Sequence, residues 1–589
     1  PYMNENWFQR ACLVGDPSTS GISCVITNEH IHEILDVAGF EEVNTVYSGS
    51  FAGEMQSGIS DGVAFFNYRG YYGVSGFTSN NVNNTNNGFM LPVATVITCG
   101  TGSFASEEAL SESFIRAGTS ANPRGSVVCI GTATLGTHTM FNNIVGMGFY
   151  YGAMIKGIET VGAALMYGKM MLHQNYPSNP NNYADIFAHW NNLMGESSLQ
   201  MWTDYPQLMS VTHPYAVNKG TNYIDINVTI GLEPVKDSWV TIYMEDEMIE
   251  SGYTNSAGFV RLPISTDSEG EVHVTITKQN HYPYQNSFQI YDPGVAVNVS
   301  ESTLAIDDDN TGDSNGNGNG NANGGETIEL YISAKNYGDD DASGISGVLV
   351  SGNTNATIIN NTISYGAINS GETVSAPTPF VIQFADGLQE GADLDLIVTF
   401  LDEGGSTSSG LINLNISGNN LFASNLDVLG TVNDILNPGQ SSYLKIQLSN
   451  IGSTSASNIT GTITCASPFI EIIDNTGIWN SIMNGGAAYN NDDYFEVSAL
   501  DETIPGAIAH LILNLETSDG YTTNSIIEIQ IGEATVYDPV GPDAHGYYIY
   551  DSGDIEYLLA PAYNWVEIDD RYGGSGSHLS SLTDSGNNQ

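Results

Sequence analysis

The chain has 589 residues, of which 13 are Lys or Arg and 66 are Asp or Glu, so its formal net charge at pH 7 is −53. Such an acidic chain offers no basic face to phosphate groups, which argues strongly against nucleic acid as a partner and disfavours an anionic membrane surface. No apolar run reaches the length of about 18 residues that a membrane-spanning helix needs, so no transmembrane segment is predicted.

Apolar, strand-like runs alternate with helix-like patterns over residues 1–156. The predicted strands cover 11–15, 63–68, 93–99 and 127–131, and the predicted helices cover 28–38, 107–117 and 140–156. Strands that alternate with helices are typical of right-handed βαβ crossovers and a parallel sheet. The chain is therefore predicted to begin with an α/β domain in which every strand has its carboxyl end on one edge.

Side chains with catalytic potential follow these predicted strands. Asp16, Tyr71, Cys99 and His138 each come after one of the apolar runs, so we expect them to share one crevice. Cys99 enters the glycine-rich turn 100–104, and an acid and an imidazole near such a thiol are what activated-thiol catalysis needs. The alternative is a buried core cysteine, because free Cys is among the most buried residue types.

Cys99 to Phe104 forms a Cys-x-x-x-x-Phe segment at a strand end, and through it the chain resembles the gingipain-type cysteine peptidases of family C25. Further segments resemble the family's acid after an apolar-Gly strand, its Glu-x-x-x-Arg helix, its pocket strand and the end of its catalytic unit: Asp16, Glu112–Arg116, Ile130–Thr132 and Leu193–Ser197. The resemblance covers residues 5–215. It implies a caspase-like fold, a Cys99 nucleophile and protein or peptide substrates.

One position departs from the family pattern. The family's second strand ends in Asn-Tyr-x-x-His-Gly, whose His is the general base, whereas Tyr71 stands at that place here. A phenol with a pKa of about 10 is a poor base at neutral pH. We predict His138 as the substitute, the alternative being a polar residue that lines the pocket. The charge of Arg69 is a second way to ionise Cys99.

The cysteines and the overall composition indicate a compartment. The chain has five cysteines, which are too few and odd in number for a disulfide framework. High acidity, few basic residues and many Asn, Gly, Thr and Ser residues favour an extracellular or cell-surface location for a secreted bacterial protein. Because the chain starts just before a core strand, we expect a leader, propeptide or subdomain upstream of residue 1.

The pattern changes after about residue 222, where short alternating strands with frequent turns predict β-sandwiches. The first such unit resembles the immunoglobulin-like module that follows the gingipain catalytic unit. The predicted class is therefore a multidomain protein, with a caspase-like α/β domain followed by tandem all-β immunoglobulin-like sandwiches. The predicted domains cover residues 1–222, 223–292, 293–418 and 419–533, and 534–589 begins a further β-domain that continues beyond the chain.

Two of these sandwiches are predicted to be internal repeats. Asn336-Tyr337-Gly338 recurs as Asn450-Ile451-Gly452, an offset of 450 − 336 = 114. Two other short motifs, at 323–326 and 343–347, recur with the same offset. A period this long indicates tandem domains rather than a solenoid. The pair resembles the adhesion-type sandwiches of bacterial surface proteins.

The first repeat contains a loop, residues 307–326, in which Asp and Asn alternate with Gly. Calcium takes six to eight oxygen ligands, and this loop is rich in them, so we predict Ca²⁺ as a cofactor; the alternative is a flexible linker. The predicted ligands are Asp307, Asp308, Asp309, Asn310, Asp313, Asn315, Asn317 and Glu326.

Two function hypotheses follow. The first is a secreted or cell-surface gingipain-like cysteine endopeptidase that hydrolyses peptide bonds through the Cys99 thiolate. The second is a catalytically impaired pseudopeptidase that acts as a surface adhesin or as an extracellular assembly or filament subunit with self-assembly partners. The Cys99 turn favours the first and Tyr71 favours the second; the sequence leaves open activity, specificity and oligomeric state.

Overall fold

The computed structural model describes residues 6–105, 108–136, 138–535, 537–541, 548–550, 554 and 556–560. The chain divides into two compact units. The first comprises Pro1–Val217, Tyr223–Ile264 and Ser268–Ile290, and the second comprises Asn218–Asn222, Ser265–Asp267 and Tyr291–Gln589. Most of the predicted tail domain at 534–589 lies outside the described residues.

The first unit opens with a six-stranded sheet in the order β2-β1-β3-β4-β5-β6. The strands are β1 (Arg10–Gly15), β2 (Glu42–Val46), β3 (Phe65–Arg69), β4 (Val93–Val96), β5 (Val128–Thr132) and β6 (Asn191–Met194). The first five are parallel to one another, and β6 runs antiparallel to β5. The prediction of a parallel α/β sheet at the start of the chain is confirmed.

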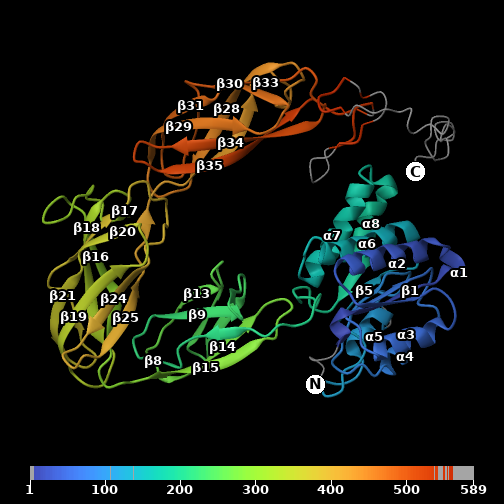
Figure 1. Cartoon of the computed structure of the whole chain (residues 1–589), viewed down its shortest axis with the longest axis horizontal. Helices are drawn as coiled ribbons and strands as arrows, with labels where there is room; N and C mark the ends of the chain where they lie inside the picture. Colours follow the sequence, from blue (N-terminus) through green and yellow to red (C-terminus); the bar gives the residue numbers. More distant parts are fainter. Residues whose placement is uncertain are drawn as a thin grey trace. The chain divides into compact units, whose positions relative to one another are not determined.

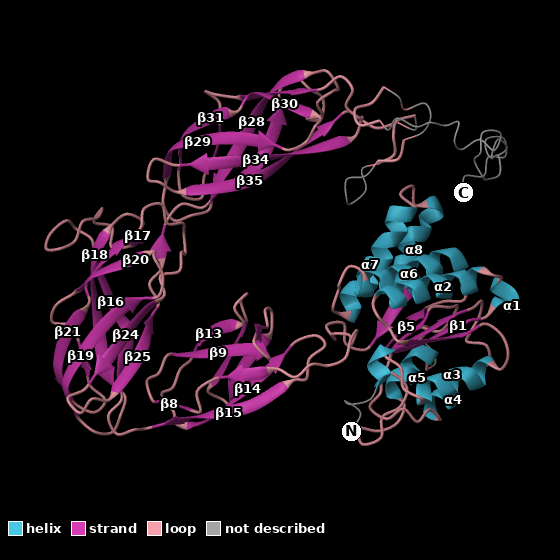
Figure 2. Cartoon of the chain, viewed as in Figure 1, coloured by secondary structure: helices cyan, strands magenta, loops and turns pink. Residues whose placement is uncertain are grey.

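Helices cover both faces of this sheet (Figures 1 and 2). They are α1 (Pro17–Ser20), α2 (Ser23–Val37), α3 (Phe51–Ser60), α4 (Ser79–Asn83), α5 (Leu110–Arg116), α6 (Thr139–Met154), α7 (Val161–Asn175) and α8 (Tyr183–Trp190). One core joins the sheet to α2, α6, α7 and α8, and another joins it to α3, α4 and α5. A strand buried on both faces reads as a continuous apolar run, which is why β1, β3, β4 and β5 are visible in the sequence.

The rest of the first unit is all β and forms two sheets around one core. Its strands are β7 (Ser210–Thr212), β8 (Ala216–Asn218), β9 (Tyr223–Ile230), β10 (Glu233–Pro234), β11 (Trp239–Met244), β12 (Met248–Tyr253), β13 (Phe259–Pro263), β14 (Gly270–Thr277) and β15 (Tyr284–Tyr291). The sheets have the orders β10-β9-β13, with β7 beside β9, and β12-β11-β14-β15-β8.

The second unit holds two consecutive β-modules. The first has β16 (Val297–Asp307), β17 (Ala322–Asn323), β18 (Thr327–Asn336), β19 (Ala342–Ser351), β20 (Ala356–Asn360), β21 (Thr362–Ile368), β22 (Thr373–Val374), β23 (Phe380–Phe384), β24 (Leu396–Leu401), β25 (Thr407–Ile412) and β26 (Ile416–Ser417). The second has β27 (Leu421–Val428), β28 (Ser441–Asn450), β29 (Ala456–Cys465), β30 (Ile470–Asp474), β31 (Thr476–Ile482), β32 (Ala487–Tyr489), β33 (Phe495–Ala499), β34 (Ala507–Glu516) and β35 (Thr522–Ile531).

The strand orders show that the two modules are repeats. The sheets β16-β18-β23-β20 and β21-β19-β24-β25 correspond strand by strand to β27-β28-β33-β30 and β31-β29-β34-β35. Val297 pairs with Asn336 and Leu421 pairs with Asn450, so the offset is 421 − 297 = 124 on the first strand and 450 − 336 = 114 on the second. The first module therefore has ten extra residues between Val297 and Asn336, a segment that contains the Asp/Asn-rich loop and a bulge in β16.

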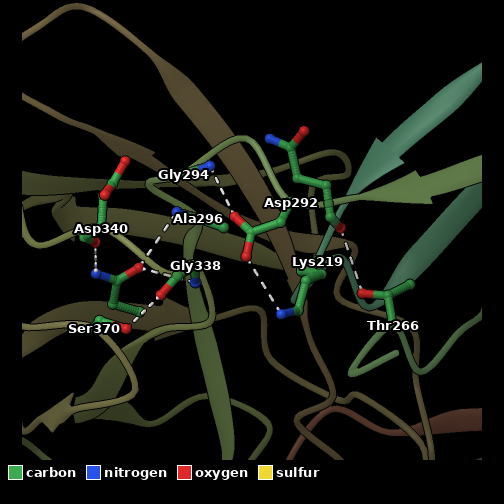
Figure 3. Close-up of polar contacts among 10 residues, drawn as sticks. Lys219, Thr266, Asp292, Gly294, Ala296, Gly338, Asp340 and Ser370 are labelled. Atoms are coloured by element: carbon green, nitrogen blue, oxygen red, sulfur yellow. Dashed lines mark hydrogen bonds and ion pairs between the residues drawn. The ribbon is translucent and has the colours of Figure 1, made fainter. Parts of the chain in front are cut away.

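The repeated Asn-x-Gly motif fixes the segment that leads into each module (Figure 3). Asn336 is buried, donates to the Asp340 and Ile368 carbonyls, and accepts from the amides of Gly338 and Ala296. Gly338 is required by a close approach, because a Cβ there would lie 2.1 Å from the Gly294 carbonyl oxygen.

A half-buried ion pair precedes the first module, and Figure 3 shows it beside the Asn-x-Gly turn. The Asp292 carboxylate accepts from the Gly294 amide at 2.7 Å and from the Lys219 ammonium at 3.3 Å. Burial works to raise the pKa of Asp292, but these two donors outweigh it and hold that pKa below its usual value.

Asn450 bonds the corresponding backbone groups in the second module, so its replacement tests how much the motif stabilises a module. It donates to the Thr454 and Ile482 carbonyls and accepts from the amides of Gly452 and Asn420. Asn450→Ala would leave these backbone groups without partners, so we expect a loss of about 3 kcal/mol of module stability.

Hydrogen exchange of residues 441–531 in the full chain would measure that loss module by module. Asn484→Ala is the matched control, because Asn484 is exposed and its amide donates one bond, to the Ser453 carbonyl. The control should change stability by less than about 0.5 kcal/mol. Equal protection in both variants would contradict the role of Asn450.

Candidate active site

The four predicted site residues follow parallel strands at the same edge of the sheet. Asp16 follows β1 directly, Tyr71 follows β3 by two residues, and Cys99 follows β4 by three. His138 caps the N-terminus of α6, six residues after β5. The predicted strand 93–99 is too long, since β4 ends at Val96 and the Thr98 amide turns back to the Val96 carbonyl.

The loop that carries Cys99 is held by backbone hydrogen bonds on both sides. On one side the amides of Gly100 and Gly102 donate to the carbonyls of Thr134 and Thr132, at 2.7 and 3.0 Å. On the other side Cys99 forms a bridge with Tyr72, and its carbonyl accepts from the Gly73 amide. The Cys99 side chain is thereby fixed at the edge of the sheet, and the residue is 7% exposed.

The Asp16 carboxylate accepts hydrogen bonds from two serines. One carboxylate oxygen accepts from the amide and hydroxyl of Ser18, and the other accepts from the Ser75 hydroxyl. Ser75 also contacts the Tyr68 hydroxyl and has a φ of 42°, in the left-handed region that non-glycine residues rarely adopt. Burial works to raise the pKa of Asp16, but the Ser18 and Ser75 bonds outweigh it and lower that pKa.

His138 and Tyr71 are both exposed at this edge. The Nδ1 atom of His138 accepts from the Met140 amide at 3.4 Å, and the ring packs edge-on against Phe141. In this arrangement the neutral imidazole carries its proton on Nε2. Tyr71, which the sequence resemblance sets at the position of the family's imidazole, is 57% exposed.

Arg69, the last residue of β3, is fully buried below this edge. Its Nε and Nη2 atoms donate to Asn143 Oδ1 at 3.0 and 2.5 Å, and Nη2 donates to the Thr139 carbonyl at 3.3 Å. Burial lowers the pKa of Arg69 to about 10, against the attraction of Cys24, Tyr68 and Cys99, so the guanidinium stays charged at neutral pH.

A column of buried amides and hydroxyls lies on the same face of the sheet as Arg69. Asn67 donates to Asn28 Oδ1 at 2.8 Å and accepts from Thr95 Oγ1, which also contacts the Tyr150 hydroxyl at 3.1 Å. These residues join β3 and β4 to α2 and α6. The sequence analysis did not predict this column or the role of Asn143. The available signal was the polar pair Asn67 and Arg69, which occupy alternate positions of the otherwise apolar strand β3.

The predicted calcium ligands fall into two groups in the second unit. Asp308, Asn317 and Glu326 gather with two residues that the prediction did not include, Asn319 and Asn323. Asp307, Asp309 and Asn310 make local bonds within the loop, whereas the backbones of Asp313 and Asn315 bond to Glu329 and Thr327 of β18.

Asp308 and Glu326 are the charged members of the first group. Asp308 is 3% exposed and accepts from the amides of Asn319 and Gly320. The Oε2 atom of Glu326 is buried and has no hydrogen-bond partner. Burial first, and then the Asp308 charge, raises the pKa of Glu326. Within the described ranges no three His, Cys, Asp or Glu side chains converge as a metal site, so amide and backbone oxygens would have to complete a calcium shell.

The cysteines and the lengths of the described helices bear on two further predictions, the absence of a disulfide framework and of a transmembrane segment. None of the five cysteines, which all lie in the described ranges, forms a disulfide, and Cys12, Cys24, Cys99 and Cys129 are buried. Burial raises the pKa of Cys12 to about 12, so that thiol is inert at neutral pH. Of the helices that the structure describes, none is long and apolar enough to cross a membrane.

Comparisons with known proteins find a family similarity over the first part of the chain. Residues 2–202 match the family model of peptidase family C25. The crystal structure of the Arg-specific cysteine proteinase gingipain R is similar, with 18% identity and a TM-score of 0.44 over 49% of this chain and 68% of that chain. A complex of the pro- and mature domains of RgpB from Porphyromonas gingivalis has the same identity and TM-score and is covered to 70%.

A Ca²⁺-stabilized adhesin of an Antarctic bacterium is also similar, with 12% identity and a TM-score of 0.14 over 58% of this chain and 79% of that chain. Among curated proteins no sequence match is found. The assignment rests on the family match, because the structural likenesses have low identities and low TM-scores. Over residues 2–202 this chain is therefore similar to peptidase family C25.

Proposed function

We propose that the first domain is a thiol-dependent peptidase and that Cys99 is its nucleophile. The observation that carries this proposal is the position of Cys99 within the family C25 domain, in a loop fixed by backbone bonds at the carboxyl edge of a parallel sheet. In the proposed reaction the Cys99 thiolate attacks the scissile carbonyl and forms a C–S bond. The imidazolium of His138, formed when the imidazole takes the Cys99 proton, protonates the leaving amine as the C–N bond breaks, and water then hydrolyses the resulting thioester and releases the Cys99 sulfur.

Labelling with a thiol-directed peptide electrophile tests this proposal across about pH 5 to 9. Cys465 is the internal control, because it is a free thiol that is more exposed than Cys99. Selective labelling of Cys99, lost in Cys99→Ala and slowed at least about tenfold in His138→Ala, is the expected result. Preferential labelling of Cys465 would contradict it, since it would mean that reactivity follows exposure alone.

A second candidate function is a pseudopeptidase that acts as a surface adhesin or assembly subunit. It is favoured by Tyr71 in place of the family's imidazole and by the serine bonds that occupy Asp16. Loss of a partner in a catalytic unit typically costs orders of magnitude in rate. The absence of any Cys99 labelling above that of the denatured chain would select this candidate.

The remaining proposals concern location and metal. An extracellular or cell-surface location is supported by the net charge of −53. Calcium binding by the 307–326 loop is supported by the buried Glu326 oxygen without a partner and by its neighbour Asp308. Immunoglobulin-like topology of the β-modules stays a prediction.

A further inference from the structure

Leu135 is an exposed apolar residue that lies beside the loop of Cys99. It follows β5 by three residues, and a Cβ at Gly100 would lie 2.9 Å from the Leu135 Cδ2 atom. Because Gly100 is the next residue after Cys99, the Leu135 side chain packs against the immediate neighbour of the proposed nucleophile. The side chain is nevertheless 64% exposed, so this contact leaves most of its apolar surface open to a ligand.

Hydrogen bonds fix the backbone around Leu135 against the Cys99 loop. The Gly100 amide donates to the Thr134 carbonyl at 2.7 Å, and the Thr134 amide donates to the Ser103 hydroxyl at 2.8 Å. Thr134 has a φ of 73°, in the left-handed region that a β-branched residue rarely adopts. Such conformations persist only where surrounding contacts enforce them, and they cluster at active sites and ligand clamps. Leu135 therefore stands on a backbone with one defined position.

A second exposed apolar residue comes from the Cys99 loop itself. Phe104 is 57% exposed and directly follows Ser103, whose hydroxyl bonds to the loop of Leu135. The two loops that are bonded together around Cys99 thus each present a large apolar side chain to solvent. A pair of this kind next to a proposed nucleophile indicates recognition of an apolar group.

The sequences of the loops around Cys99 exclude an acidic recognition element within them. The three loops that hydrogen-bond to one another there, residues 70–77, 97–105 and 133–138, contain no Asp or Glu, although the chain has a net charge of −53. Asp16, the acid that follows β1 at the same edge, is bonded by two serines. These loops therefore offer apolar surface to a substrate side chain and no charge that would neutralise a basic one.

We propose that Leu135 is a specificity residue and that the substrate carries a large apolar residue, such as leucine, at the carbonyl that Cys99 attacks. The proposal rests on the proposed function, in which Cys99 is the nucleophile. When a carbonyl meets the sulfur, the side chain of the same substrate residue comes next to the neighbours of Cys99, where Leu135 lies. An apolar side chain gains by removing apolar surface from water, whereas an arginine would lose water without gaining a carboxylate from these loops.

Two peptidyl chloromethyl ketones that differ only in this residue, leucine or arginine, test the proposal on the full chain. In both reactions the Cys99 sulfur forms a C–S bond and displaces chloride, so the ratio of the two rates cancels the intrinsic reactivity of the thiol. We expect labelling of Cys99 to be at least about tenfold faster with the leucine reagent. Leu135→Ser should lower this ratio at least about fivefold, and Leu135→Asp should favour the arginine reagent, because it supplies a carboxylate.

Leu208→Ser is the matched control. Leu208 is the same residue type, is 74% exposed, and lies outside the residues 2–202 that match the peptidase family. Its replacement should leave the ratio of the two rates unchanged. The alternative is that Leu135 is one of the single exposed apolar residues that are normal on protein surfaces. Equal rates with the two reagents, or a ratio that Leu135→Ser does not change, would select that alternative and overturn the proposal.

Peptide binding to the Cys99→Ala chain separates this proposal from the proposed function, because binding needs no reactive thiol. The leucine peptide should bind at least about fivefold more tightly than the arginine peptide, and Leu135→Ser in the same background should remove the difference. Equal dissociation constants would overturn the proposal. Tighter binding of the leucine peptide, with no labelling of Cys99 in the natural chain, would leave the role of Leu135 intact and contradict peptidase activity; labelling at equal rates by both reagents would do the reverse.

Discussion

Tyr71→His is expected to raise the rate at which Cys99 reacts with a peptide electrophile by about 10²-fold at neutral pH. The substitution places an imidazole where the sequence resemblance to family C25 sets the general base. Tyr71 is 57% exposed, so the exchange costs little packing. A base with a pKa near the working pH removes the thiol proton far more effectively than a phenol whose pKa is about 10.

Tyr72→His is the control for this prediction. Tyr72 is the next residue, is 64% exposed, and stands one position away from the family's imidazole. Asp16→Asn added to Tyr71→His should reverse part of the gain, because the resemblance gives Asp16 the task of orienting the imidazole. Equal rates for Tyr71→His and Tyr72→His would mean that position 71 has no special access to Cys99.

The elements that the sequence predicts well are those buried on both faces. Strands β1, β3, β4 and β5 are nearly continuous apolar runs, and parallel pairing then puts their carboxyl ends on one edge. The sheet also contains β2, which the sequence analysis missed. It is the edge strand Glu42–Val46, mostly exposed or half-buried and with polar residues at three of its five positions, so no apolar run marks it.

The contacts within the site were beyond sequence reasoning for a different reason. Spacing placed Asp16, Cys99 and His138 at one edge, but the partners of Asp16 depend on Ser75, whose backbone adopts a left-handed turn that no sequence pattern marks. The helix cap formed by His138 Nδ1 likewise depends on where α6 begins. Which groups Asp16 and His138 bond to depends on side-chain geometry, whereas their position at this edge of the sheet follows from the strand topology.

In the Asp/Asn-rich loop, too, the sequence predicted the kind of segment but not the contacts of its side chains. Alternation of Asp, Asn and Gly indicated an oxygen-rich turn, and the strand pairing shows that the segment containing it is ten residues longer than its counterpart in the second module. Which oxygens converge was not predictable, because a loop without a regular period gives no rule for the direction of its side chains. Asn319 and Asn323 were missed on that account.

Calcium is expected to stabilise the first β-module of the second unit, by about 4 kcal/mol at a concentration 1,000 times the dissociation constant. The carboxylates that bring this about are Asp308 and Glu326, which face each other in a buried part of the loop. Asp308→Asn and Glu326→Gln should each abolish most of the gain. Asp434→Asn is the control, because Asp434 bonds to the Val428 amide in the second module, which lacks the inserted residues.

The pH dependence of stability gives this prediction a second readout with a definite sign. Without metal, the pKa of Glu326 is raised in the folded chain, so its contribution is fully present below the unfolded value of 4.5 and is lost as the pH rises through the raised pKa. With calcium bound, the carboxylate must be ionised, so stability rises with pH over the same window. Melting curves of the metal-free and calcium-loaded chain should therefore slope in opposite directions there, and parallel slopes with equal melting temperatures would show that the loop binds no calcium.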